Sequence, residues 1–162
     1  MATLTINNAA CGIPEVEDEC YGYLYNWYAV DDARNLTNTG WHVMTWSDML
    51  NLVDYVTGSS HDYLDAGDNL GDGGELKTEG TTYWQSPNIN ATNEYGFSAI
   101  GSGMRLPPVG FMGLNEFTSF YTSDRETSTP EPPYVDEVGI LSISNGTTFG
   151  YSFMFGLVLI LS

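Results

Sequence analysis

Two histidines, His42 and His61, are the side chains that could serve as a general base in a nucleophilic site. His42 stands in a Gly-Trp-His-Val segment, which favours a hydrogen-bonded structural histidine, and His61 stands in a polar stretch, where an exposed side chain is expected. The sequence has no GxSxG, HExxH, P-loop or Rossmann fingerprint. A carboxylate pair for glycoside hydrolysis is an unspecific signal, because 21 acidic residues always include some pair. The residue types favour a binding or structural domain, with an acid-pair hydrolase as the weakest alternative.

The segment 59–80 is polar, rich in glycine and dense in carboxylates. Carboxylate and amide oxygens are the ligands that Ca²⁺ prefers, but the spacing does not match an EF-hand loop. Two interpretations stay open for this segment: a calcium site and a solvated acidic loop. The candidate metal ligands are Asp65, Asp68, Asp72 and Glu75, with Asp62 and Asn69 as further oxygen donors.

Aromatic side chains next to this segment are the candidate ligand-binding residues. An exposed Tyr or Trp ring can stack on a ligand, and the same ring can instead fill a core. For the segment that follows the glycine-rich loop both interpretations stay open, and its candidates are Tyr83, Trp84, Gln85 and Asn88. Elsewhere the core interpretation is favoured, and the expected framework residues are Trp27, Trp41, His42 and Trp46.

The charge of the chain is strongly one-sided. Four Lys and Arg residues face 21 Asp and Glu residues, for a net charge of −17. Nucleic acid and anionic lipid are therefore excluded as direct partners, because the cations that neutralise phosphates are missing. The excess of acid is typical of a soluble protein whose copies repel one another. A surface that collects Ca²⁺ or meets a basic partner is the alternative.

The most hydrophobic run, residues 153–161, has nine residues and is too short to span a bilayer, which needs about 20. We expect it to be a buried last strand, and we expect no membrane insertion. The first residues show neither a basic nor an apolar signal region, which suggests a mature exported form or a virion component. Cys11 and Cys20 could form a disulfide or stay free, since spacing alone does not decide between them.

The pattern of the chain predicts an α+β fold with few helices. The clearest helix covers 45–58, where Thr45 and Asp48 form a capping box and Gly58 supplies the stop. The aromatic segment 21–30 is expected to be a strand that leads into a shorter helix, because Leu24, Trp27 and Tyr28 have helical spacing, and this helix is expected to continue toward Arg34. Short strands or ordered loops are predicted at 81–88, 96–100, 110–114, 117–122, 138–144 and 151–161, with an exposed loop at 127–133. We divide the chain into an arm, 1–20, and one domain, 21–162.

Several segments, in this order, resemble one family. The segment 21–30 is similar to its opening signature, and 40–43 with the helix at Trp46 is similar to its second motif, although Met44 stands where proline is usual. Segments 74–77, 80–88, 91–105 and 120–124 match later parts. The family is the Fibrobacter succinogenes major paralogous domain of bacterial surface proteins and their phages. The resemblance implies a C-type-lectin-like fold, related to that of formylglycine-generating enzymes, with two short helices and a small antiparallel sheet.

The departures from the family limit what the resemblance implies. The formylglycine-generating relatives use cysteines late in the fold, whereas Cys11 and Cys20 precede the domain, so that activity is not expected. The lectin sugar-calcium triplets Glu-Pro-Asn, Gln-Pro-Asp and Trp-Asn-Asp are absent. The family's last strand carries an arginine that the apolar segment 150–160 lacks, which suggests that another subunit covers this strand.

These observations lead to two functional hypotheses. The first is a non-enzymatic virion protein, such as a head-fibre, decoration or adhesin subunit, that forms a homo-oligomer, contacts other virion proteins and displays its loops to a host glycan or surface protein. The second is a carbohydrate-binding module on a bacterial cell surface that could depend on Ca²⁺. Neither hypothesis requires a cofactor other than Ca²⁺.

Overall fold

The computed structural model describes residues 21, 24–34, 36–62, 65–106, 108–127 and 136–155; at 125–127, 136, 137 and 151–155 it describes the backbone alone. The expected arm, both cysteines, most of the predicted loop at 127–133 and residues 156–161 of the predicted last strand lie outside this description. The elements, in chain order, are α1 (Trp27–Val30), α2 (Trp46–Thr57), the 3₁₀ turn η3 (Gly74–Leu76), β1 (Met104–Leu106), β2 (Gly110–Met112), β3 (Phe117–Thr127), β4 (Asp136–Ser144) and β5 (Phe149–Phe155).

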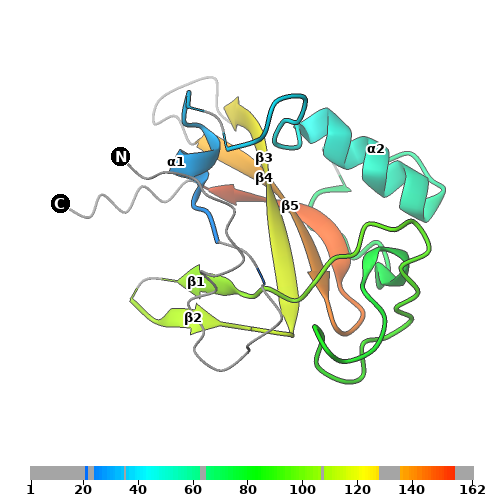
Figure 1. Cartoon of the computed structure of the whole chain (residues 1–162). Helices are drawn as coiled ribbons and strands as arrows, with labels where there is room; N and C mark the ends of the chain where they lie inside the picture. The colour runs from blue at the N-terminus through cyan, green and yellow to red at the C-terminus, as the bar shows by residue number, and fades with distance from the viewer. Residues whose placement is uncertain are drawn as a thin grey trace.

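Two small antiparallel sheets organise the described part of the chain. Strands β3, β4 and β5 pair in that order, and β1 pairs with β2 as a separate hairpin. Figure 1 shows α2 and the β1–β2 hairpin on opposite sides of the three-stranded sheet. The predicted class, α+β with two short helices and small antiparallel pairing, is confirmed, with two sheets where one was predicted.

Helix α2 begins and ends at the predicted residues. The Thr45 hydroxyl accepts a hydrogen bond from the Asp48 amide at 3.1 Å, and the Asp48 carboxylate accepts from the Thr45 amide at 2.9 Å, which completes the capping box. Gly58 ends the helix in the left-handed conformation, with φ of 69°. Met49 and Val53 are fully buried, so the predicted apolar stripe faces the core.

The core lies between α2 and the three-stranded sheet. Gly139 of β4 allows Trp46 to approach closely, because a Cβ atom at position 139 would lie 2.7 Å from Cε3 of the indole. The same Cβ would lie 2.8 Å from the Thr122 hydroxyl of β3. The buried hydrophobic cluster consists of Met49, Val53, Leu76, Trp84, Ala99, Leu141, Ile143 and Phe149.

The turn between β4 and β5 joins the sheet to distant loops through Asn145. The Asn145 amide donates to the carbonyl of Glu116 at 2.8 Å, and its side-chain amide donates to the carbonyl of Gln85 at 3.0 Å. The Asn145 carbonyl accepts from the amide of Ile89, also at 2.8 Å. One turn residue therefore fixes both the 85–89 loop and the residue that precedes β3.

Several predicted elements differ from the observed ones. Helix α1 ends at Val30 and does not continue toward Arg34, because the Asp32 side chain accepts the Arg34 amide at 2.9 Å in a local turn that competes with the helix. Of the two possibilities predicted for 81–88, a short strand or an ordered loop, the loop is observed, as bends and turns, and 96–100 contributes one bridge, between Ala99 and Lys77. The third and fourth strands reach beyond their predicted ends, to Phe117–Thr127 and Asp136–Ser144.

Candidate functional site

Trp84 is a core residue and not a ligand platform. Its side chain has no exposed surface, and its Nε1 donates to the carbonyl of Ala99 at 3.0 Å. A ring without an exposed face cannot stack on a ligand, so the ligand-binding interpretation of Trp84 is wrong. The indole fills the cluster below the glycine-rich loop, and its one polar atom is satisfied there.

The other three predicted ligand-binding residues do not form a shared surface with Trp84. Asn88 is buried, and its side-chain amide donates to the carbonyls of Thr78 and Gly80, so it supports the loop backbone. Tyr83 is half-buried, packs against the core and meets the ring of Tyr21 edge-on at 5.6 Å. Gln85 alone of the four is exposed.

The expected framework residues have different surroundings. Trp46 packs on the core and Trp27 is half-buried, but Trp41 is 74% exposed, which contradicts its predicted place in the core. The Thr37 hydroxyl donates to the Trp41 carbonyl at 2.6 Å, so the backbone at Trp41 is fixed while its ring faces outward.

His42 is hydrogen-bonded, as expected, although its side chain is exposed. Its Nε2 lies 2.9 Å from the Asp48 carboxylate of the capping box. Hydrogen bonds from Thr45 and then from His42 lower the pKa of Asp48 to about 2. The arrangement stabilises the start of α2.

The four predicted calcium ligands do not share a site. In the described part of the chain, no three His, Cys, Asp or Glu side chains come together as a metal-binding group. Asp65 instead accepts the Asp62 amide at 2.9 Å, and Asp72 accepts the Gly74 amide at 2.9 Å, so each carboxylate closes its own turn. Asp68 is exposed, so of the two interpretations left open for this segment the described carboxylates fit the solvated acidic loop.

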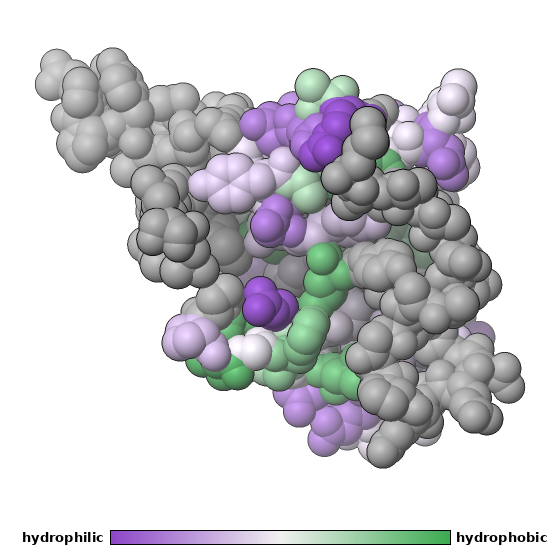
Figure 2. All heavy atoms as spheres, turned by 60° about the vertical axis from the view of Figure 1, so that its left-hand side comes forward, coloured by the Kyte–Doolittle hydropathy of each residue, from purple (hydrophilic) through white to green (hydrophobic). Residues whose placement is uncertain are grey.

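The β1–β2 hairpin carries an exposed apolar surface that the sequence did not predict. Its members, which we call the hairpin surface, are Leu106, Val109, Phe111, Met112 and Leu114, and Phe111 and Val109 are the most exposed, at 76% and 68%. Because neighbouring side chains point to opposite faces of a strand, exposure of both Phe111 and Met112 leaves both faces of β2 open. Figure 2, turned to bring this side forward, shows hydrophobic residues down its centre.

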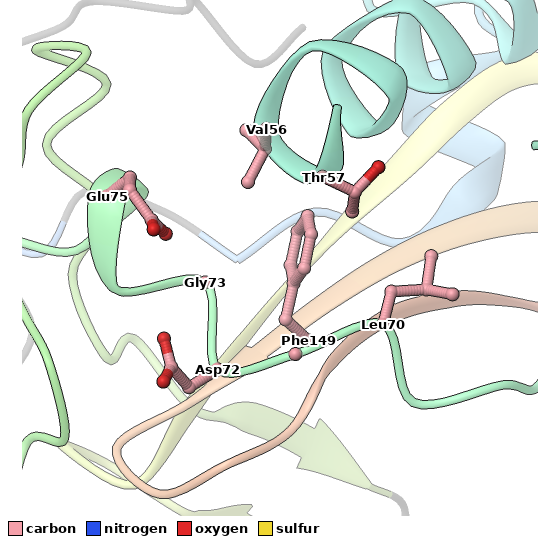
Figure 3. A pocket seen from close by; sticks show the side chains of 8 residues that line it. Val56, Thr57, Leu70, Asp72, Gly73, Glu75 and Phe149 are labelled. Carbon is pink, nitrogen blue, oxygen red and sulfur yellow. The ribbon is translucent and has the colours of Figure 1, made fainter. Parts of the chain in front are cut away.

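A pocket of about 200 Å³ lies between the last turn of α2 and the loop that precedes η3 (Figure 3). We call it the α2 pocket, and its lining residues are Val56, Thr57, Leu70, Gly71, Asp72, Gly73, Glu75 and Phe149. Figure 3 shows Asp72 and Glu75 on one side of the Phe149 ring and Leu70 on the other. Two of the predicted calcium ligands therefore border a half-apolar pocket.

An exposed tyrosine pair next to this pocket was also missed. Tyr55 and Tyr95 meet edge-on with ring centroids 4.9 Å apart, and Tyr55 directly precedes Val56 of the pocket. Burial, and then the charges of neighbouring groups including Glu75, raise the pKa of Tyr95. The one available signal was that Tyr55 falls off the apolar stripe of α2, which marks an outward-facing aromatic residue.

Among the described residues no helix is long and apolar enough to cross a bilayer.

Comparison with known proteins identifies the family of the chain. No curated protein and no solved structure matches the chain significantly. The model of the Fibrobacter succinogenes major domain matches residues 5–139, a range that includes most of the expected arm. The chain therefore belongs to the Fibrobacter succinogenes major domain family.

Proposed function

We propose that the chain is a non-enzymatic attachment domain that is held in a larger assembly through its hairpin surface. The observation that carries the proposal is the exposure of Val109, in the turn of a projecting hairpin, and of Phe111, in its strand β2. Exposed apolar surface of this kind is typical of protein–protein interfaces, since its burial removes it from water. Each large side chain contributes about 1.5–3 kcal/mol when fully buried.

The composition around the hairpin supports a protein partner. Residues 95–115 contain no Asp or Glu and one charged residue, Arg105, in a chain of net charge −17. The Arg105 guanidinium lies 5.9 Å from the centroid of the Phe111 ring, a cation–π arrangement. Aromatic residues, Met and Arg are enriched in interfaces and carboxylates are depleted, as they are here. Copies of the chain repel one another through their net negative charge, and this repulsion would be least where they meet at the hairpin surface, which has no carboxylate.

The assembly that we propose is a phage particle, in which the domain is a head-fibre, decoration or adhesin subunit with a C-type-lectin-like scaffold. The proposal is supported by the family of the chain, which the resemblance described above links to bacterial surface proteins and their phages, and by the hairpin surface. The partners would be further copies of the chain and neighbouring virion proteins.

The first test is association in solution and on particles. The purified chain should sediment as an oligomer, or co-sediment with purified phage particles, and mass spectrometry of those particles should detect it. The double substitution Val109→Ser and Phe111→Ser should abolish association. Trp41→Ser, which alters an equally exposed aromatic residue elsewhere, should leave it intact. A wild-type chain that stays monomeric and binds no particle protein would refute the proposal.

A further inference from the structure

The α2 pocket has an apolar half that is fixed in place before any ligand arrives. The Phe149 ring, 1% exposed, closes the base of the pocket, and the half-buried Val56 and Leu70 beside it present its apolar surface (Figure 3). The Leu70 amide donates to the Phe149 carbonyl at 2.7 Å. A Cβ atom at Gly73 would lie 3.1 Å from the Phe149 ring, so this glycine, with φ of 59°, packs directly against the base of the pocket. The pocket is therefore preformed, as ligand sites usually are.

The polar half of the pocket consists of two carboxylates. Asp72 accepts the Gly74 amide at 2.9 Å and the Asn90 side-chain amide at 2.6 Å, so its orientation is fixed. The Glu75 carboxylate makes no hydrogen bond or ion pair with any described residue. Each Asp72 oxygen keeps a second lone pair for another donor. Two negative charges therefore border the pocket, and one of them is free to meet a ligand.

The surroundings of the pocket also favour a positive charge. The last turn of α2 contains no basic residue, and Val56 and Thr57 of that turn line the pocket, where the negative end of the helix dipole lies. The exposed Tyr55–Tyr95 pair stands beside Glu75, since the Tyr95 amide donates to the Glu75 carbonyl at 3.4 Å. Tyrosine rings attract cations through the negative potential of their faces.

Lys77, the basic residue nearest to Asp72 and Glu75 in the sequence, does not serve as the positive partner of these carboxylates. Lys77 directs its ammonium to the carbonyls of Ser144 and Gly146, at 3.1 and 3.4 Å, and it is completely buried. Asp72 and Glu75 act on Lys77 through their negative charges and not through a hydrogen bond. Burial lowers the pKa of Lys77, and these two charges raise it. The carboxylates of the pocket therefore have no direct cationic partner among the described residues.

We propose that the α2 pocket binds a primary alkylammonium group, namely the side chain of a lysine on a partner protein. The four methylenes of a lysine would pack on Val56 and Leu70, while the ammonium would meet Asp72 and Glu75. A lysine fits this division because its stem is wholly apolar and its charge is confined to the tip. The inference extends the attachment function to a second contact on the opposite side of the sheet from the hairpin surface.

The experiment follows the backbone amides of Gly71 and Gly73 by NMR while Nα-acetyl-lysine-N-methylamide is added to the full chain. A dissociation constant on the order of millimolar is expected for a single side chain. The same compound acetylated on Nε should shift neither amide, because it has lost the charge. Butylammonium has the same ammonium tail but no peptide backbone. If it binds as tightly as the lysine compound, the pocket recognises the ammonium tail alone, and weaker binding shows that the peptide backbone contributes.

Two matched substitutions complete the test. Glu75→Gln should weaken binding about three- to tenfold, because it removes one facing charge and disturbs no hydrogen bond. Glu116→Gln removes one charge outside the pocket and should leave the affinity unchanged. Equal effects of the two substitutions, equal binding of the neutral compound, or shifts caused by calcium or a neutral oligosaccharide but not by the lysine compound would overturn the proposal. Glu75→Gln should leave association through the hairpin surface intact, so failure of one proposal does not imply failure of the other.

Discussion

The side-chain ammonium of Lys77 donates to the carbonyl oxygen of Ser144 at 3.1 Å, inside the core and at the end of β4. This contact ties the segment after η3 to the sheet. Burial lowers the pKa of Lys77 below its ordinary value of 10.5, and the charges of Asp72 and Glu75 act in the opposite direction. A buried ammonium that is held by carbonyl oxygens makes the stability of the domain depend on pH.

The first prediction concerns this dependence. The fold disfavours the charged form of Lys77, so the unfolded chain binds the proton more readily, and the free energy of unfolding should rise as the pH increases toward 10.5. The slope should reach at most about 1.4 kcal/mol per pH unit. Lys77→Met should remove this component, as urea unfolding at a series of alkaline pH values will measure. Identical pH slopes for both proteins would contradict the prediction, because the tyrosines that also titrate are common to both.

The second prediction concerns the start of α2. Thr45→Ala removes the hydroxyl that accepts the Asp48 amide and should lower the free energy of unfolding by about 1 kcal/mol. Thr45→Ser keeps the hydroxyl and should lose less than half of that amount. Thermal or urea unfolding of both variants provides the measurement. Equal losses in the two variants would show that the methyl group, and not the cap, stabilises the helix.

The third prediction concerns the contact between α2 and the sheet. Gly139→Ala places a methyl group 2.7 Å from Trp46 and should destabilise the domain by about 1–3 kcal/mol through overpacking. Gly146→Ala is the matched control, since its methyl group would lie 3.6 Å from the nearest side-chain atom, Oγ of Ser144. Denaturant unfolding should separate the two variants clearly. A Gly139→Ala variant as stable as the control would mean that α2 does not pack as described.

The fourth prediction compares two tryptophans. Trp84→Phe removes the donor to the Ala99 carbonyl and leaves a gap in the core, so the domain should lose about 1–3 kcal/mol. Trp41→Phe alters a mostly exposed side chain and should change stability by no more than about 0.5 kcal/mol. Fluorescence-monitored unfolding of each variant measures both effects. Similar losses at the two positions would contradict the burial described for Trp84.

The comparison of these tryptophans shows where prediction from sequence succeeded and where it failed. Helix α2 was predictable because the Thr45 cap, the Asp48 box and the Gly58 stop are local signals within one segment. The burial of Trp84 depends on a partner fifteen positions away in a loop, which no local pattern encodes. Trp41 stands in the Gly-Trp-His-Val segment, yet its ring faces outward, because the packing of distant segments determines which aromatic rings are covered.

The candidate sites were less predictable than the fold class. For the acidic segment the sequence leaves both a calcium site and a solvated loop open, and it does not show that local turns direct Asp65 and Asp72 to separate backbone amides. The α2 pocket depends on Phe149, which joins residues of α2 and of the acidic loop only after the last described strand is in place. The hairpin surface could not be predicted from the sequence. The pattern of a strand shows that its side chains alternate between two faces, but it does not show whether other parts of the chain cover those faces.

The three hydrogen bonds of Asn145 have a consequence for the order in which the domain assembles. They connect the β4–β5 turn to residues as far as 60 positions earlier in the chain, so the 85–89 loop cannot take its final position until that turn exists. Contacts between distant residues slow folding, because the intervening chain must close first. We therefore expect the three-stranded sheet to form before the 85–89 loop takes its final position. In pulse-labelled hydrogen exchange during refolding, the amide of Ile89 should gain protection after those of Ile140 and Leu141 in β4.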